Sequence, residues 1–539
     1  MATDDTAPGN GETQPLQQEQ ETPQKPQRKK PDPTPTMPER EDAHALTVVG
    51  IGASAGGVQA LQTFFENAPT DSGSAYIVVL HLSPDHASHL AEIIGRATGM
   101  PVRQVTDVVK VEADHVYVIP PSRHLEMEDG LLRPTEPESA RGRRVAIDLF
   151  FRTLADTHGP QSVAVVLSGS GADGALGLRQ IKERGGLTMA QDPLEAEYDG
   201  MPRSAIATGM VDFVLPASDL ARRIADYWDT SRRMRLPGEA APSPPQRDDG
   251  PDQEAALRAI LAHVRAQTGH DFAQYKRATI LRRIGRRLQV NGAEDLPGYL
   301  EFVRRHPAEV GDLVKDVLIS VTQFFRDASA WAALDREVVP RLFEGRRPDE
   351  AVRAWVCGCA TGEEAYTLAI LLQEYAQKLD RAAPPIQIFA TDMDADAIAR
   401  ARVGVYPDTI AADVSQERLR RWFTHQNGAY RVKKEVRESV LFAAHDVLRD
   451  TPFSRLDLIT CRNLLIYLEQ AAQQRVYETF HFALRPGGRL LLGSSEAVDS
   501  APGLFTPVDK QHRIYLSRPV ARSIAPIPVG VSAADMPSV

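Results

Sequence analysis

The sequence is poor in cysteine and has no long apolar run. Three cysteines in 539 residues are too few for a disulfide framework, which is typical of proteins from a reducing compartment. Cys357 and Cys359 have no second cysteine or histidine pair nearby, so we interpret them as small apolar side chains rather than half of a zinc site. No segment approaches the roughly 18 apolar residues needed to cross a bilayer, and the N-terminus lacks the order of a signal peptide. These features predict a cytoplasmic protein without a bound metal.

The chain also lacks an excess of basic residues. Its formal net charge is −10, which argues against nucleic acid as a partner of the whole chain. Hydrophobic residues make up 42% and charged residues 25%, as is typical of globular proteins. A chain of this length is too long for one hydrophobic core, so we expect two domains joined by linkers.

Changes of composition along the chain predict six parts. The N-terminal part is poor in large apolar residues. After it, two regions in which strand and helix patterns alternate are separated by a Pro-rich stretch and a helical region. The predicted parts are a disordered arm over 1–43, an α/β domain over 44–230, a linker over 231–252, a helical subdomain over 253–345, a second α/β domain over 346–517 and a disordered tail over 518–539.

The first α/β region opens with a glycine-rich turn over 50–57. Its pattern Gly52-x-Ser54-x-Gly56 fits a nucleophile elbow, in which a tight strand-to-helix turn exposes a serine hydroxyl. The same turn fits the dinucleotide fingerprint G-x-G-x-x-A, and Ser54 could also simply cap its helix. The turn alone does not decide among these three interpretations.

The strands that follow favour hydrolysis. The next predicted strand ends at His81, where a dinucleotide fold would place an acid, whereas a histidine suits a general base for Ser54. Asp173 follows another buried strand. Alone it would be interpreted as an acid that stabilises its own loop. The carboxyl ends of parallel strands lie at one edge of a sheet, so we predict a catalytic triad of Ser54, His81 and Asp173.

The second α/β region has a different turn. A strand over 352–356 leads into Cys-Gly-Cys-Ala-Thr-Gly-Glu-Glu, and the following strand ends at Asp392. An acid in that place commonly binds ribose hydroxyls, so the pattern indicates a nucleoside-containing cofactor. The glycine spacing is looser than in NAD-binding enzymes.

A basic amphipathic helix is predicted over 275–288. Ile280, Leu281, Ile284 and Leu288 form its apolar stripe, with arginines beside it. The usual explanation is a solvated basic face. The functional alternative is that Arg282 to Arg287 dock an acidic helical partner, and nucleic acid is a weaker third option.

Residues 46–228 resemble the catalytic domain of the chemotaxis receptor methylesterase. The motifs are GIGASAGG, VVLHLSPDH, VYVIPPSRH, LSGSGADGA and GMPRSAI. The resemblance implies Ser54 as nucleophile, His81 as base and Asp173 as orienting acid in the hydrolysis of glutamyl methyl esters. Ala55 and Ser170 depart from the usual threonine and methionine of the family.

Residues 253–517 closely resemble the chemotaxis receptor methyltransferase, which esterifies receptor glutamates with S-adenosylmethionine. The motifs are YKRATILRRI, SVTQFFRD, WVCGCATGEEAYTLAI, ATDMDADAIARARVGVY, DLITCRNLLIYL and LRPGGRLLLGSSE. The resemblance places Arg326 and Tyr467 near the transferred methyl group. Ser320 stands where the family often has asparagine. The implied cofactor site comprises Ser320, Thr322, Arg326, Glu364, Asp392, Asp446, Val447, Arg462 and Asn463.

The sequence therefore predicts two doubly wound α/β domains, the second Rossmann-like, with an N-terminal helical subdomain and a small antiparallel insertion near 404–445. The resemblances imply one chain that both methylates and demethylates glutamates on chemoreceptor cytoplasmic helices, peripheral to membrane-bound receptor arrays, and that could deamidate glutamine. The alternatives are an oxidoreductase, which His81 disfavours, and a degenerate signalling scaffold that retains only one activity.

Overall fold

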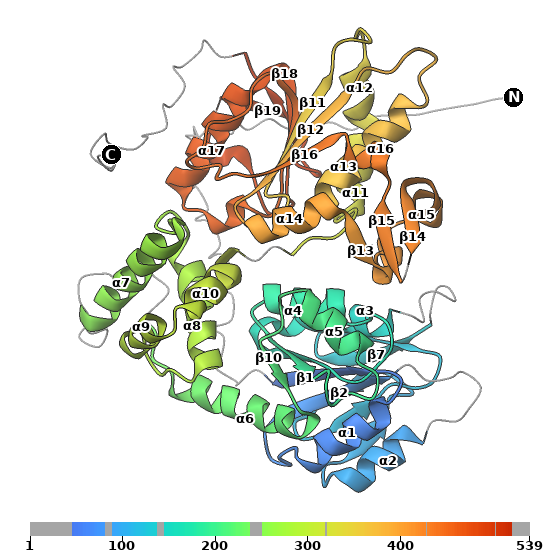
Figure 1. Ribbon diagram of the computed structural model, residues 1–539, viewed down its shortest axis with the longest axis vertical. Helices are drawn as coiled ribbons and strands as arrows, with labels where there is room; N and C mark the ends of the chain where they lie inside the picture. The colour runs from blue at the N-terminus through green and yellow to red at the C-terminus, as the bar shows by residue number, and fades with distance from the viewer. Residues whose placement is uncertain are drawn as a thin grey trace, which may run out of the picture. The chain divides into compact units, whose positions relative to one another are not determined.

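The computed structural model describes residues 46–80, 89–136, 145–237, 251–318, 321–426, 428–501 and 503–519. All of them belong to one compact unit, Leu46–Val539. Within it, two seven-stranded sheets each carry helices, and a set of helices stands between them in the sequence (Figure 1).

The first sheet is parallel throughout, in the order β10-β9-β8-β1-β2-β5-β3. Its central strands are short apolar runs that are buried on both faces, as a parallel sheet covered by helices requires. The strands are β1 (Thr47–Ala53), β2 (Ser74–Leu80), β3 (Val102–Gln104), β5 (Val116–Val118), β8 (Ser162–Val166), β9 (Leu187–Gln191) and β10 (Phe213–Leu215).

Helices cover both faces of this sheet. One hydrophobic cluster joins it to α1 (Gly57–Glu66), α2 (Leu90–Ala97) and α6 (Ala217–Arg233). A second joins the other face to α3 (Ala146–His158), α4 (Ala175–Glu183) and α5 (Gly200–Ala207). A small antiparallel sheet, β4-β7-β6, comprises β4 (Val109–Lys110), β6 (His124–Glu128) and β7 (Leu131–Thr135).

Four helices form the helical subdomain. Their apolar faces share a cluster with β11 (Val352–Cys357), β17 (Leu456–Cys461) and α17 (Gln470–Ala483) of the second α/β domain. They are α7 (Pro251–Thr268), α8 (Arg277–Asn291), α9 (Leu296–Arg305) and α10 (Ala308–Leu318). The next two helices, α11 (Ala328–Glu337) and α12 (Val339–Phe343), pack in the cluster on the other face of the second sheet. By packing they belong with the second α/β domain, although a helical subdomain to residue 345 was expected.

The second sheet runs β16-β12-β11-β17-β18-β20-β19, and β20 is antiparallel to both of its neighbours, β18 and β19, whereas the other pairs are parallel. Helix α13 (Glu363–Ala376) follows β11, and α14 (Ala395–Val403) follows β12. The strands are β11 (Val352–Cys357), β12 (Ile386–Asp392), β16 (Val440–Ala444), β17 (Leu456–Cys461), β18 (Leu484–Leu492), β19 (Phe505–Asp509) and β20 (Ile514–Ser517); α17 (Gln470–Ala483) lies between β17 and β18.

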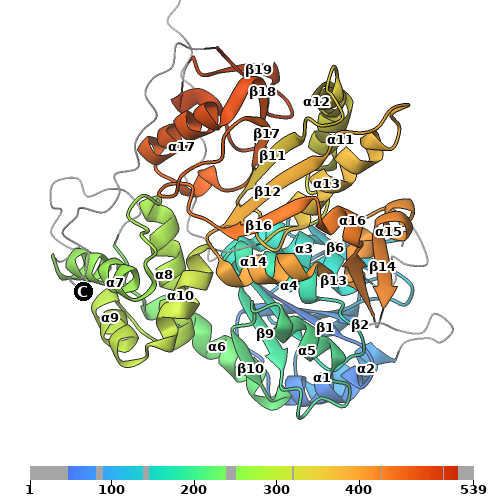
Figure 2. The same ribbon diagram turned by 45° about the horizontal axis from the view of Figure 1, so that its top comes forward.

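The predicted antiparallel insertion is present. It is the sheet β13-β15-β14, of β13 (Val405–Pro407), β14 (Phe423–Gln426) and β15 (Ala429–Val432), which lies beside α15 (Gln416–Trp422) and before α16 (Lys434–Arg437) in the chain (Figure 2). The structure thus confirms the predicted fold class: two α/β domains with parallel sheets, a helical subdomain and a small antiparallel insertion.

Candidate active sites

Ser54 lies directly after β1, on the predicted tight turn. Gly56 has a φ of 69°, a left-handed backbone conformation in which a residue with a side chain would be strained. Gly57 N donates to the Ser54 carbonyl at 2.9 Å. Ser54 N in turn donates to the carbonyl of Ser168 at 3.0 Å, so the turn after β1 is held against the loop after β8. A Cβ on Gly169 would lie 2.9 Å from the Ser54 Cβ, which shows how closely that loop approaches the serine.

Asp173 is buried at the end of this same loop. Its carboxylate accepts three backbone N–H bonds, from Ile147 at 3.0 Å and from Asp148 and Gly174 at 2.9 Å each. Two of these donors are at the start of α3, where free N–H groups favour an anion. Ser54 and Asp173 therefore come from neighbouring loops at the carboxyl edge of the sheet. His81 lies outside the described residues.

Asp148 is a second buried acid beside Asp173, and the sequence motifs did not single it out. Its Oδ1 accepts from Gly177 N at 2.7 Å, while Oδ2 is buried without a hydrogen-bond partner among the described residues. Burial, with the neighbouring Asp173 carboxylate, raises the pKa of Asp148 from 3.8 to about 8. Asp148 is thus mainly protonated near neutral pH, which keeps two adjacent carboxyl groups from both being charged.

This raised pKa predicts a pH-dependent stability. The folded protein holds a proton on Asp148 that the unfolded chain releases, so the free energy of unfolding falls as pH rises from about 4 to about 8. Asp148→Asn is a neutral mimic of the protonated acid and removes this loss. We expect the variant to match the parent at pH 4 and to melt at least about 2 °C higher at pH 8. Calorimetric melting at both pH values checks this, and equal melting curves at pH 8 would contradict it.

The second candidate site is a cavity at the carboxyl edge of the second sheet. Its wall includes every residue that the resemblance assigned to this site, apart from Ser320, which lies outside the described residues. Those in the wall are Thr322, Arg326, Glu364, Asp392, Asp446, Val447, Arg462, Asn463 and Tyr467.

Asp392, the last residue of β12, is held by the turn after β11. Its Oδ2 accepts from Ala360 N at 2.8 Å and its Oδ1 from Asp394 N at 2.9 Å. Each oxygen has a further lone pair, which can accept a hydroxyl. Burial raises the pKa of Asp392 to about 6, although the backbone donors at Asp394 and Ala360 oppose the rise. The carboxylate is therefore ionised at pH 7 and suited to bind a pair of hydroxyl groups.

Glu364 and Arg462 form a buried pair in the cavity wall. Glu364 Oε1 accepts from the Thr460 hydroxyl at 2.6 Å, and its Oε2 lies 3.6 Å from Arg462. Arg462 also donates to the Arg326 carbonyl at 2.8 Å and pairs with Asp327 at 2.6 Å. Arg462 thus fixes the segment that carries Arg326, besides neutralising Glu364.

The sequence analysis missed several residues that shape or line this site, among them three with polar side chains. Glu496 accepts backbone N–H bonds from Asn463, Leu465, Ile466 and Gly493, and so shapes the loop that forms one wall. Tyr275 lines the cavity from the helical subdomain. Glu496 and Tyr275 lie in quoted motifs, which was a usable signal. Glu183 lines the cavity from α4 of the first α/β domain, and no sequence pattern pointed to it.

The interpretation of helix 275–288 as a solvated basic face was wrong. Arg283, Arg286 and Arg287 of α8 are all buried. The reason is that buried carboxylates and backbone carbonyls from other segments pair with them; Arg287, for example, binds Glu309 through two hydrogen bonds of 2.8 and 2.5 Å. Arg282 remains exposed.

Neither a metal cluster nor a membrane span was found in the described ranges. No group of three or more His, Cys, Asp or Glu in them is arranged to hold a metal ion. Every helix in those ranges is too short or too polar to cross a lipid bilayer. The three cysteines are buried and free.

The two sites define a class of protein. A serine on a strand-to-helix turn beside a buried aspartate is typical of hydrolases, and a Rossmann-like sheet with an acid after its second strand is typical of nucleoside-dependent transferases. Residues 49–224 match the family model of the CheB methylesterase. Residues 255–318 match the all-alpha domain of the CheR methyltransferase, and 320–514 match its SAM binding domain. The chain belongs to both families, with a methylesterase domain and an S-adenosylmethionine-dependent methyltransferase fused in one polypeptide.

Relatives match one or both halves. An uncharacterized 104.1 kDa protein of Rhodobacter capsulatus is 39% identical over 79% of this chain, which spans 46% of that protein's length. A putative methyltransferase, Cher3, of Pseudomonas putida is 33% identical over 48% of this chain and 95% of its own length. A putative protein-glutamate methylesterase/protein-glutamine glutaminase of Leptospira interrogans is 35% identical over 32% of this chain and 89% of its own length.

Proposed function

We propose that this chain sets the methylation level of chemoreceptors by adding methyl groups to receptor glutamates and removing them again. The observation that carries the proposal is the presence of a methylesterase domain and a chemotaxis-type methyltransferase in one chain. The substrates are glutamates and glutamyl methyl esters on the cytoplasmic helices of receptors, which places the enzyme in the cytoplasm at the receptor array. The esterase domain also deamidates glutamine, because amide and ester hydrolysis share acyl chemistry.

In the esterase domain, Ser54 Oγ attacks the ester carbonyl and His81 takes its proton. His81 then gives that proton to the departing methoxy oxygen, which leaves as methanol, and water hydrolyses the acyl-serine to regenerate Ser54. Asp173, whose carboxylate is fixed by three backbone N–H groups, holds His81 in orientation. The N–H groups at the start of α1 stabilise the oxyanion.

In the transferase domain, the cavity fits S-adenosylmethionine. Asp392 offers paired acceptors for ribose hydroxyls, and the acidic side chains of Glu364 and Asp446 line the same wall. The cofactor supplies a methyl group on a sulfonium. The protein must align the acceptor carboxylate with that methyl group and remove water from around it. Arg326 aligns the carboxylate by pairing with it, and Tyr467 excludes water by closing the cavity beside it.

The test uses the full chain with the cytoplasmic fragment of a methyl-accepting receptor. Incubation with radiolabelled S-adenosylmethionine should place base-labile label on receptor glutamates, and fragment that has been methylated beforehand should release methanol when cofactor is omitted. Label on the receptor without methanol release, or the reverse, would favour the alternative of a chain with one working activity. Absence of both label on the receptor and methanol release would overturn the proposal.

A further inference from the structure

The cavity of the methyltransferase contains a side chain of the methylesterase domain. Glu183, the last residue of α4, lines the cavity with Arg326 and Tyr467, and its Oε1 lies 3.4 Å from the Arg326 guanidinium. Its side chain is only 13% exposed. Burial raises the pKa of the Tyr467 phenol, and the nearby Glu183 carboxylate raises it further. A glutamate thus pairs with the arginine that is expected to receive the substrate glutamate.

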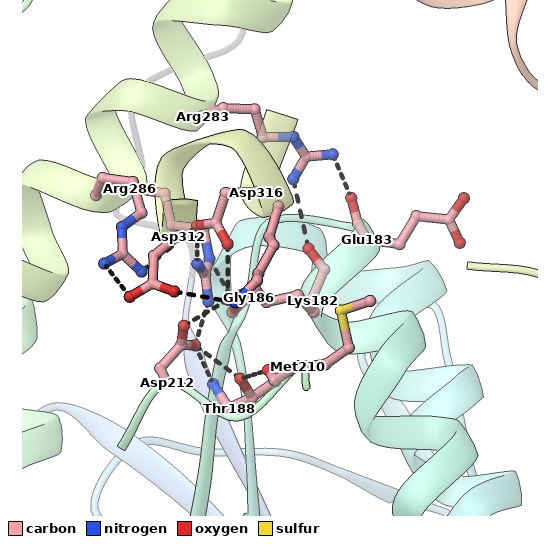
Figure 3. A network of polar contacts seen from close by, with 12 residues as sticks. Lys182, Glu183, Gly186, Thr188, Met210, Asp212, Arg283, Arg286, Asp312 and Asp316 are labelled. Carbon is pink, nitrogen blue, oxygen red and sulfur yellow. Dashed lines mark hydrogen bonds and ion pairs between the residues drawn. The ribbon is translucent and has the colours of Figure 1, made fainter. Parts of the chain in front are cut away.

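The backbone at the end of α4 is held by α8. Arg283 donates to the carbonyls of Lys182 at 3.4 Å and Glu183 at 2.7 Å, and Arg286 donates to that of Gly186 at 3.1 Å (Figure 3). The last carbonyls of a helix have no intrahelical partner and carry partial negative charge, so a guanidinium is a favourable cap. Arg283 and Arg286 therefore hold the end of α4, which carries Glu183, and the turn after it through hydrogen bonds.

A buried network of ion pairs lies beside these hydrogen bonds between α8 and the end of α4. Asp212 of the esterase domain pairs with Arg286 and, at 2.6 Å, with Lys182. Asp316 of α10 pairs with the same two cations, at 2.5 Å from Arg286 and 2.8 Å from Lys182 (Figure 3). Burial alone would raise the pKa of Asp212, but Arg286 and Lys182 outweigh it and hold the pKa below its ordinary value. The esterase domain and the helical subdomain thus each contribute one carboxylate and one cation, and the four charges neutralise one another.

A second group of contacts joins α4 of the esterase domain to the methyltransferase. Arg179, one turn before the helix end, donates at 3.1 Å to the hydroxyl of Thr361 in the glycine turn after β11 and lies 3.6 Å from Glu363, the first residue of α13. These contacts are polar and charged rather than apolar. Each partner would be well hydrated if the surfaces separated, as is typical of interfaces that open and close.

We propose that the end of α4 is an intrachain ligand of the methyltransferase. Glu183 occupies the position of the acceptor glutamate, and α4 occupies, against α8, the position of a receptor helix. The inference rests on the proposed function, because it takes receptor glutamates as the acceptors. Docking of the esterase domain and docking of a receptor helix then exclude each other. A receptor must displace Glu183 from Arg326 before it can be methylated.

The test is Glu183→Ala in the full chain. This variant removes the carboxylate that pairs with Arg326 but leaves the ion pairs of Arg286 and Lys182 with Asp212 and Asp316 in place. If about 80% of the chain is docked at a given moment, kcat/KM for methylation of a receptor fragment should rise about fivefold. The affinity for S-adenosylmethionine, measured by calorimetry, should stay within about twofold. The matched control is Glu66→Ala, which removes an exposed glutamate from the end of α1 in the same domain.

A second measurement does not depend on methylation. Phenylglyoxal modifies accessible guanidinium groups, and mass spectrometry reports the rate at each arginine. Arg326 should react several-fold faster in Glu183→Ala than in the parent chain, while exposed Arg282 serves as internal reference.

The outcomes separate this inference from the proposed function. Faster labelling of Arg326 together with faster methylation supports the inference. Unchanged labelling, unchanged methylation despite faster labelling, or a methyl ester found on Glu183 itself would overturn it. Faster labelling with no methylation of the receptor by any variant would support occupancy of the arginine by Glu183 and refute the proposed substrate.

Discussion

Ser54→Ala should lower ester hydrolysis by at least roughly a thousandfold, since loss of a catalytic nucleophile leaves only binding and oxyanion stabilisation. Methyl transfer by the same variant should stay within about twofold, because Ser54 lies at the edge of one sheet and the S-adenosylmethionine cavity at the edge of the other. The measurement is methanol release from premethylated receptor fragment, with incorporation of label from S-adenosylmethionine as the second readout.

The control is Ser218→Ala, which removes a serine hydroxyl near the start of α6. It should leave both activities unchanged. Thermal melting of each variant shows whether the fold is preserved. Loss of methyl transfer in folded Ser54→Ala would mean that the two sites are not independent, and retention of esterase activity would remove Ser54 from the mechanism.

The sequence predicted the two sheets well because their strands are short apolar runs that end in turns. β1, β8 and β17 are buried along their whole length or nearly so, and the residue pattern shows that directly. The residues placed around the two sites also follow strands. The rule that parallel strands gather their carboxyl ends therefore predicted that the turn of Ser54 meets the loop that ends at Asp173, and that Asp392 lines its cavity.

Contacts between segments far apart in the chain could not be predicted. Arg286 pairs with Asp212, 74 positions away, and Arg283 with the backbone of Glu183, 100 positions away. A helix with arginines beside an apolar stripe has the same sequence pattern whether those arginines meet water or buried carboxylates. The pattern therefore indicated α8 correctly and its exposure wrongly. Glu183 carried no signal because its role depends on where the end of α4 lies.

Asp392→Ala should weaken binding of S-adenosylmethionine by about 1–3 kcal/mol, the typical loss when a hydrogen bond to a charged group is removed. That corresponds to roughly a 5- to 150-fold rise in Kd. The physical reason is that both oxygens of Asp392 are aligned by backbone donors, Ala360 N and Asp394 N, and retain lone pairs for the ribose hydroxyls. Calorimetry at pH 7.5 measures the change. Asp396→Ala, which removes an exposed carboxylate from the first turn of α14, is the matched control and should bind as the parent does.

The same residue predicts how affinity depends on pH. Burial raises the pKa of Asp392 to about 6, and the ligand binds the ionised form, so binding must lower that pKa. Affinity in the parent chain should therefore be constant above pH 7 and fall as pH drops through about 6, because the protonated carboxyl no longer accepts two hydroxyl bonds. Asp392→Ala should lose this decline and bind with a weaker, nearly flat affinity across the same range. A decline near pH 6 that persists in Asp392→Ala would assign the titration to another group. An unchanged Kd at pH 7.5 would place Asp392 outside the contacts that hold the cofactor.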